Sequence, residues 1–212
     1  MGLPLLAISL AGGLLQLPMI DTTTITVLGA VSIVALIGLS AFFSSSEIAF
    51  FSLPQHRIES MVEEGIPNAE TVKALKDDPH RLLVTILVGN NIVNIAMSSI
   101  ATALFGIYLT QGQAVIAATF GITAVVLLFG ESAPKSYAVE NTESWALRIA
   151  SSLKLSEYAL FPLIIVFDKL TRGVNKAMGG SSAIESPYVT RDESKDIIET
   201  GERAGVIDEE ER

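Results

Sequence analysis

The sequence predicts an all-α integral membrane protein with three transmembrane helices, a shallow helical hairpin and juxtamembrane helices, followed by a cytosolic acidic helical segment. Half of the 212 residues are hydrophobic and the mean hydropathy is +0.50, which excludes an ordinary soluble fold. The apolar residues fall in blocks near residues 24–46, 82–109, 112–130 and 146–167. The first three blocks approach or exceed the ~20 residues that a helix needs to cross a bilayer.

The distribution of lysine and arginine gives the expected topology. None of the 14 basic residues precedes Arg57, and none lies between Arg81 and Lys135. Because cytoplasmic loops carry the excess of Lys and Arg, we expect residues 54–80 and everything from Lys135 onward to be cytoplasmic. The helices then cross near residues 24–52, 81–108 and 113–135, with the amino terminus outside and the carboxyl terminus inside. We expect a multi-pass protein of the plasma membrane.

Composition divides the chain into four segments. We expect a lead segment over residues 1–20 that is extracellular or interfacial, a transmembrane domain over 21–178, a linker over 179–189 and the start of a cytosolic acidic helical segment over 190–212. Residues 54–80 alternate acidic and apolar positions, which favours amphipathic helices on the membrane surface, with a solvated loop as the alternative. The chain stops at Arg212 inside a charged run, which suggests that it is cut from a longer protein.

The fourth apolar block, Trp145 to Phe167, is interrupted by Lys154, Glu157 and Pro162. A charge at the bilayer centre is costly, and a full crossing here would place the acidic segment outside. We therefore expect a shallow helical hairpin that enters from the cytoplasmic side.

Composition also excludes several classes of function. The net charge of −9 weighs against nucleic-acid binding, and the absence of cysteine excludes disulfides and thiolate metal sites. His56 and His80 lie beside prolines in the cytoplasmic stretch, where we expect no metal role. Because no phosphate-binding loop, Ser-His-Asp set or pair of catalytic carboxylates is present, we do not expect an enzyme.

Polar residues within the expected crossings point to a bound cation. Ser40 and Ser44 share one face of the first helix, and Asn90 and Asn94 share one face of the second. Glu131 lies near the end of the third helix. It is a candidate ligand, because ionisable groups inside a membrane are functional by default. Pro134 has no N–H to donate four residues back, and this leaves the carbonyl of Gly130 free. The candidate ligands are therefore Ser40, Ser44, Asn90, Asn94, Gly130 and Glu131.

Six hard oxygen donors suit octahedral Mg²⁺, with bound water replacing some of them where dehydration is too costly. Alternatives remain for several of the polar residues. The two asparagines could simply join two helices, and Glu47 could pair with Lys135 rather than touch a metal. Ser45 and Ser46 are expected to bond their own helix backbone.

Three motifs together resemble the transmembrane domain of the CorC and cyclin M family. The first helix has Ser-x-x-x-Ser from Ser40 to Ser44 and Ser-x-x-Glu-x-Ala from Ser44 to Ala49. The second has Gly-Asn-x-x-Val-Asn over residues 89–94, and the third has Gly-Glu-x-x-Pro-Lys over residues 130–135.

The resemblance implies a homodimer in the lipid membrane that exports magnesium, with sodium entry as the driving reaction. The same resemblance implies that residues 21–178 form an ion-transport domain. Adenine nucleotide would bind only to cytosolic regulatory modules that are absent from this sequence. The alternative is a membrane-embedded magnesium sensor or scaffold that regulates another transporter.

Overall fold

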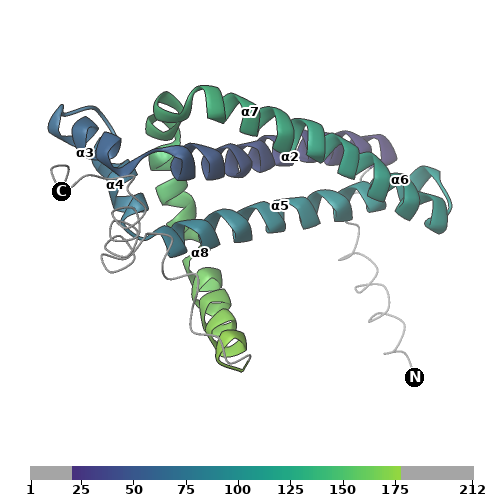
Figure 1. The fold of residues 1–212 in the computed structure, drawn as a ribbon. Coiled ribbons are helices and arrows are strands. Elements are labelled where there is room, and N and C mark those ends of the chain that lie inside the picture. The colour runs from purple at the N-terminus through teal and green to yellow at the C-terminus, as the bar shows by residue number, and fades with distance from the viewer. Residues whose placement is uncertain (1–20, 178–212) are drawn as a thin grey trace, which may run out of the picture.

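The computed structural model describes residues 21–177, so the expected lead segment, linker and acidic segment lie outside the described residues. All the elements of the described part are helical, which confirms the predicted fold class (Figure 1). In chain order they are α2 Thr22–Ser52, α3 Gln55–Glu63, α4 Ala69–Lys76, α5 Pro79–Tyr108, α6 Gln111–Val125, the π-helix η1 Val126–Ser132, α7 Ala133–Glu140 and α8 Thr142–Ala177.

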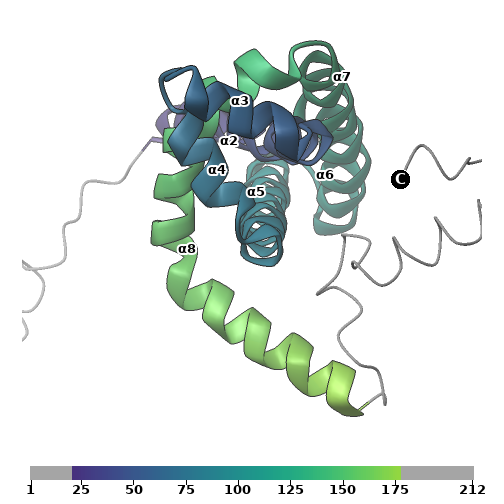
Figure 2. The same cartoon turned by 60° about the vertical axis from the view of Figure 1, so that its left-hand side comes forward.

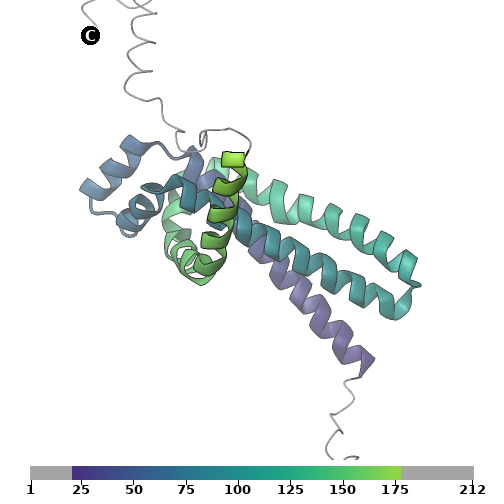
Figure 3. The same cartoon turned by 90° about the horizontal axis from the view of Figure 1, so that it is seen from below.

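Three long helical units run side by side: α2, α5 and the continuous α6–η1–α7 (Figures 1 and 3). Each is long and apolar enough to cross a membrane, and they coincide with the three predicted crossings. Val31 and Val34 on α2 and Phe120 on α6 are 61%, 69% and 74% exposed. Large apolar side chains exposed to this degree are expected to face lipid rather than water.

The expected hairpin is wrong, because residues 142–177 form the single helix α8 with Pro162 inside it. The Glu157 carboxylate is buried and pairs with Arg81 and with Lys154, the latter at 3.0 Å. The charges that argued for a turn therefore neutralise one another within the helix and against α5. Pro162 bends rather than ends the helix, and Figure 2 shows α8 changing direction along its length.

α8 is also long and apolar enough to cross a membrane, yet it runs across the other three units rather than along them (Figures 1 and 3). It lies at the end of the bundle that carries α3 and α4, and it contacts α4. If α2, α5 and α6–η1–α7 stand upright in the bilayer, the orientation of α8 places it along the membrane surface.

The stretch between α2 and α5 consists of two amphipathic helices, as predicted, and not of a solvated loop. α3 buries Ile58 and Met61 and exposes Glu59. Arg57 of α3 donates two hydrogen bonds to the carboxylate of Glu143 on α8, at 2.8 and 2.9 Å. These contacts fix α3 to the start of α8.

Lys76 closes the end of α2. The residue is 7% exposed, and its amine donates to the carbonyl of Phe50 and, at 2.8 Å, to that of Leu53. The last carbonyls of a helix lack donors within the helix, and a cation is favoured there by the helix dipole. Lys76 therefore joins α4 to α2.

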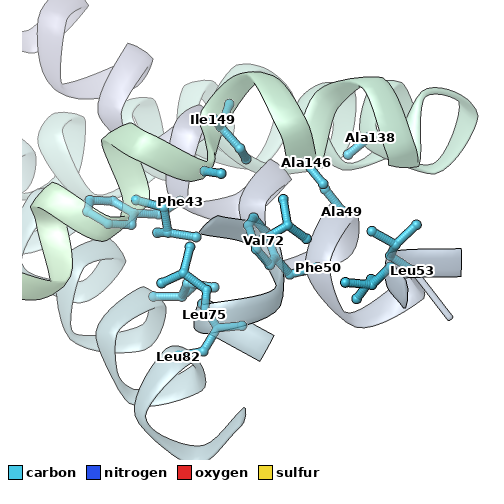
Figure 4. Close-up of a cluster of buried hydrophobic side chains, with 14 of the residues drawn as sticks. Phe43, Ala49, Phe50, Leu53, Val72, Leu75, Leu82, Ala138, Ala146 and Ile149 are labelled. Atoms are coloured by element: carbon cyan, nitrogen blue, oxygen red, sulfur yellow. The ribbon is translucent and has the colours of Figure 1, made fainter. Parts of the chain in front are cut away.

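The buried hydrophobic core lies at this same end, where α2, α3, α4, α5, α7 and α8 meet (Figure 4). Phe50, Ile58, Met61 and Leu82 are at most 1% exposed. The buried residues of α2 begin only at Ser40, so its first half faces outward and its second half forms part of the core. The polar residues singled out from the sequence lie next to this core.

Candidate ion-binding site

Ser40 brings the three crossing units together. Its side chain is fully buried, and its hydroxyl lies 3.1 Å from the Oδ1 atoms of both Asn90 and Asn94. A hydroxyl has one hydrogen and both amide oxygens are acceptors, so three oxygens converge around a single proton. Such an oxygen cluster is suited to a cation. The predicted meeting of Ser40, Asn90 and Asn94 is therefore confirmed.

Gly130 is packed directly against Ser40. A Cβ atom at Gly130 would lie 2.9 Å from the Ser40 Oγ and 3.2 Å from its Cβ, closer than ordinary contacts. Only glycine lets the backbone of η1 approach the hydroxyl of Ser40 this closely. A fourth expected ligand residue is thus next to the oxygen cluster.

The third crossing carries a π-helical segment that the sequence interpretation missed. The N–H of Ala133 bonds to the carbonyl of Leu128, five residues earlier. In a π-helix the N–H of residue 134 would bond to the carbonyl of Phe129, and in an α-helix to the carbonyl of Gly130. Pro134 has no N–H, so neither carbonyl receives a hydrogen bond from it. Pro134 was the available signal, but a proline does not reveal the register of the helix before it.

Ser44 lies one turn from Ser40 on α2 and is 1% exposed. Its hydroxyl oxygen has no hydrogen-bond partner among the residues that the structure describes. A buried polar group without a partner costs about 1–3 kcal/mol. A cation with its bound water would supply the missing partner, so Ser44 fits the predicted ligand set.

The two nearby carboxylates differ in their environment. Glu131 is half-buried in η1, immediately after Gly130. Glu47 forms an ion pair with Lys135 at 3.0 Å, which confirms the alternative that it pairs with this lysine. This ion pair joins α2 to α7, one turn beyond Ser44 and Glu131 along their helices.

Several neighbouring polar residues are structural. The hydroxyls of Ser45 and Ser46 donate to the Phe42 carbonyl at 3.1 and 2.6 Å, as expected. The Asn91 amide donates to the Leu87 carbonyl on its own helix at 2.8 Å. Neither the serines nor Asn91 therefore adds a ligand to the site.

Gly89 serves packing rather than ion binding. A Cβ at this position would overlap the ring of Phe43, which is buried. The glycine of the second motif thus makes room for an aromatic side chain of α2.

The site has few charged groups. Within residues 21–177, no three His, Cys, Asp or Glu side chains form a group that could hold a metal. The donors are hydroxyl, amide and backbone oxygens with one carboxylate, which favour a hard cation such as Mg²⁺, Ca²⁺ or Na⁺ over a soft one.

Comparison with known proteins identifies a family and several relatives of the chain. Residues 31–211 match the family described as the cyclin M transmembrane N-terminal domain. The chain is 36% identical over 181 residues to a chloroplastic DUF21 domain-containing protein of Arabidopsis thaliana, covering 84% of this chain and 27% of the relative. It is 32% identical over 161 residues to the UPF0053 inner membrane protein YfjD of Escherichia coli, covering 76% and 37%.

A polyamine export protein of Escherichia coli is 27% identical over 191 residues, covering 84% of this chain and 42% of the relative. The chain therefore spans less than half of the length of these curated relatives.

Proposed function

The chain belongs to the family of cyclin M transmembrane domains, and from this premise we propose that it exports Mg²⁺, driven by sodium entry. The ion would be held, largely dehydrated, by Ser40, Ser44, Asn90, Asn94, the Gly130 carbonyl and Glu131. The observation that carries the proposal is the convergence of three oxygens around one proton at Ser40.

The spacing of these oxygens fits magnesium, and it equally fits the hydrogen bonds that join them. Octahedral Mg²⁺ binds oxygen at about 2.1 Å, so neighbouring ligands in the octahedron lie about 3.0 Å apart. The Ser40 oxygen lies 3.1 Å from each asparagine oxygen. Ca²⁺, with bonds of about 2.3–2.6 Å, needs wider spacing in the same geometry. One carboxylate against two positive charges gives modest affinity, which lets the ion leave.

The π-helix η1 offers a hinge for transport. It lies between α6 and α7, carries Gly130 and Glu131, and ends just before Pro134. π-Helical segments and proline breaks are common where helices bend and where sites form. A change of register there would move two ligands at once, and sodium on the outer side would favour the state that releases Mg²⁺.

We further propose the topology and partners that complete this function. The amino terminus is outside and the carboxyl terminus cytoplasmic, because Arg57, Arg81 and Lys135 all lie at the end of the bundle with α3 and α4. The transporter acts as a homodimer in the plasma membrane and has no enzymatic activity. Adenine nucleotide acts only through cytosolic modules outside this sequence.

Polyamine export, the function named for one relative, fits these residues less well. A polyamine carries several ammonium groups spread along an apolar chain, and each buried charge needs a partner. The site concentrates neutral oxygens at one point and adds one carboxylate, which suits a compact cation.

One observation favours a magnesium sensor as the second candidate. In the half of the bundle away from α3, the hydroxyls of Ser32, Ser99 and Thr102 donate to carbonyls of their own helices. They therefore offer a weakly polar path to the outer face. A sensor would bind Mg²⁺ at the same site without moving it.

Reconstitution separates these functions. Mg²⁺ flux is measured in proteoliposomes with and without a sodium gradient, for the wild type, Asn94→Ala and Glu131→Ala. Asn91→Ala is the matched control, because its amide bonds the backbone of its own helix. We expect sodium-dependent flux in the wild type and the control and its loss in the two site variants.

Magnesium binding is measured separately by thermal stabilisation in detergent. Binding without flux in the wild type would replace the exporter by the sensor. Flux that is equal in Asn94→Ala and Asn91→Ala would reject the site. Transport of spermidine in preference to Mg²⁺ would reject the cargo.

A further inference from the structure

A cavity lies on another side of α2. It is a groove of about 320 Å³ between α2, α7 and the start of α8. Gly38, Ala41 and Phe42 line it from α2, Pro134 and Tyr137 from α7, and Trp145 from α8. Its volume is within the range of about 300–1,000 Å³ that is usual for sites of small organic ligands.

The groove lies on a different side of α2 from the ion-binding site. Residues of an α-helix follow one another at about 100° around the axis, so Gly38 and Ala41 are centred about 110° around α2 from Ser40 and Ser44. In the bilayer this face opens sideways toward lipid. It belongs to the half of α2 nearer to α3 and α4, and the leaflet on that side is therefore the one that reaches it.

The chemistry changes along the groove from apolar to polar. Tyr137 and Trp145 form an edge-to-face pair with ring centroids 5.3 Å apart, and such aromatic residues are typical of the level of lipid head groups. The indole N–H of Trp145 is buried and has no hydrogen-bond partner among the described residues. The guanidinium of Arg148, an exposed residue, lies 6.0 Å from the centre of the Trp145 ring.

The positive charge of Arg148 is not neutralised by Glu143, the acidic residue near the start of α8. Glu143 is held by two hydrogen bonds from Arg57, at 2.8 and 2.9 Å. Arg148 therefore offers a cation to an anion that enters beside Trp145. Trp145 links this cation to the apolar wall of α2, because its ring is near Arg148 and also lines the groove with the residues of α2.

We propose that this groove binds an anionic glycerophospholipid from the leaflet on the α3–α4 side. One acyl chain lies along Gly38 and Ala41, the ester region lies beside Trp145, and the phosphate lies at Arg148. The lipid contacts both α2 and α7, the two elements that the Glu47–Lys135 ion pair also joins. This binding does not depend on the identity of the transported ion.

Trp145 reports on the groove directly, because it is the only tryptophan of the chain. Its fluorescence is measured in vesicles of phosphatidylcholine that contain a minor share of phosphatidylglycerol, with bromine on the acyl chains of one lipid at a time. Bromine quenches tryptophan by contact. We expect brominated phosphatidylglycerol to quench about fivefold more than its share of the lipid predicts, the preference that one basic residue near a membrane surface provides.

Two variants test the two parts of the site. Arg148→Gln should abolish the excess quenching by phosphatidylglycerol and keep quenching by phosphatidylcholine. Gly38→Leu should reduce quenching by both lipids, because a Cβ at Gly38 meets open space and the longer side chain fills the groove. Gly121→Leu on α6 also meets open space and is the matched control, with wild-type quenching expected.

Two results would overturn the proposal. Quenching in proportion to the share of each lipid, unchanged in Arg148→Gln and Gly38→Leu, would mean bulk lipid without a site. Fluorescence that neither brominated lipid quenches would mean that protein covers the groove, such as a second copy of the chain.

Discussion

Ser44 and Ser45 are neighbours in sequence and each is 1% exposed, yet only one of them has a hydrogen-bond partner in the described structure. The Ser45 hydroxyl donates to the Phe42 carbonyl at 3.1 Å, whereas the Ser44 oxygen is unpartnered. Replacing either serine by alanine removes one hydroxyl group at the same degree of burial. The two variants therefore compare the free energy cost of a buried hydroxyl without a partner with the stabilisation from a structural hydrogen bond.

Without Mg²⁺, Ser44→Ala should raise the free energy of unfolding by about 1 kcal/mol, since an unsatisfied buried group costs about 1–3 kcal/mol and the small void left behind offsets part of the gain. Ser45→Ala should lower it by about 0.5–1 kcal/mol, the value of a typical hydrogen bond. The loss is limited because the Phe42 carbonyl still accepts from Ser46 at 2.6 Å.

With Mg²⁺ the Ser44→Ala variant loses its advantage over the wild type. Binding at a hundredfold excess over the dissociation constant stabilises a protein by about 2.7 kcal/mol. If Ser44→Ala weakens binding tenfold, about 1.4 kcal/mol of that stabilisation is lost at the same concentration. Ser45→Ala should keep the whole Mg²⁺-dependent gain.

The assay is unfolding of purified protein in mixed micelles, followed by circular dichroism with and without Mg²⁺. The reasoning fails if Ser44→Ala is destabilised without Mg²⁺ as much as Ser45→Ala. It also fails if the two variants gain equally from Mg²⁺.

Three further predictions concern other contacts. Gly130→Ala should weaken Mg²⁺ binding at least tenfold by isothermal titration, because its Cβ would lie 2.9 Å from the Ser40 oxygen, whereas Gly121→Ala should bind normally. Lys76→Met should lower the free energy of unfolding by about 2–3 kcal/mol, the value of hydrogen bonds from a charged group. Burial lowers the pKa of the Lys76 amine below 10.5, so the unfolded chain keeps this proton to a higher pH than the folded chain does. The free energy of unfolding of the wild type should therefore rise with pH in the window below 10.5. Denaturation at several pH values should show this rise in the wild type and not in Lys76→Met. Glu157→Gln should cost about 2 kcal/mol, less than the 3–5 kcal/mol of a fully buried pair because its partners are a third exposed, and should speed deuterium exchange in α8.

The crossings were predictable because hydropathy and the positions of lysine and arginine are properties of the chain alone. Four of the six expected ligand residues are shown in contact, because Ser40 touches Asn90, Asn94 and Gly130. Helical spacing placed each pair on one face, and the shared need of polar groups for partners in lipid predicted that the faces meet.

The course of α8 was not predictable, because its charges are resolved by distant residues. Lys154 and Glu157 look like breaks in an apolar block, and only the position of Arg81 at the start of α5 shows that the Glu157 carboxylate is paired. Local sequence records the cost of a buried charge but not the partner that offsets it. The close approach of Gly130 in η1 to Ser40 was hidden for a similar reason, since the two residues are far apart in sequence.

The position of the core explains how the chain keeps a polar site with an unsatisfied group. The site begins at Ser40, one turn before Ser44, and the packed residues Phe50 and Leu82 belong to the same helices α2 and α5. Burying such a side chain contributes about 1.5–3 kcal/mol, enough to offset one unpaired hydroxyl. The ends of α2 and α5 at α3 and α4 are thereby held by packing, and the end of α2 also by Lys76.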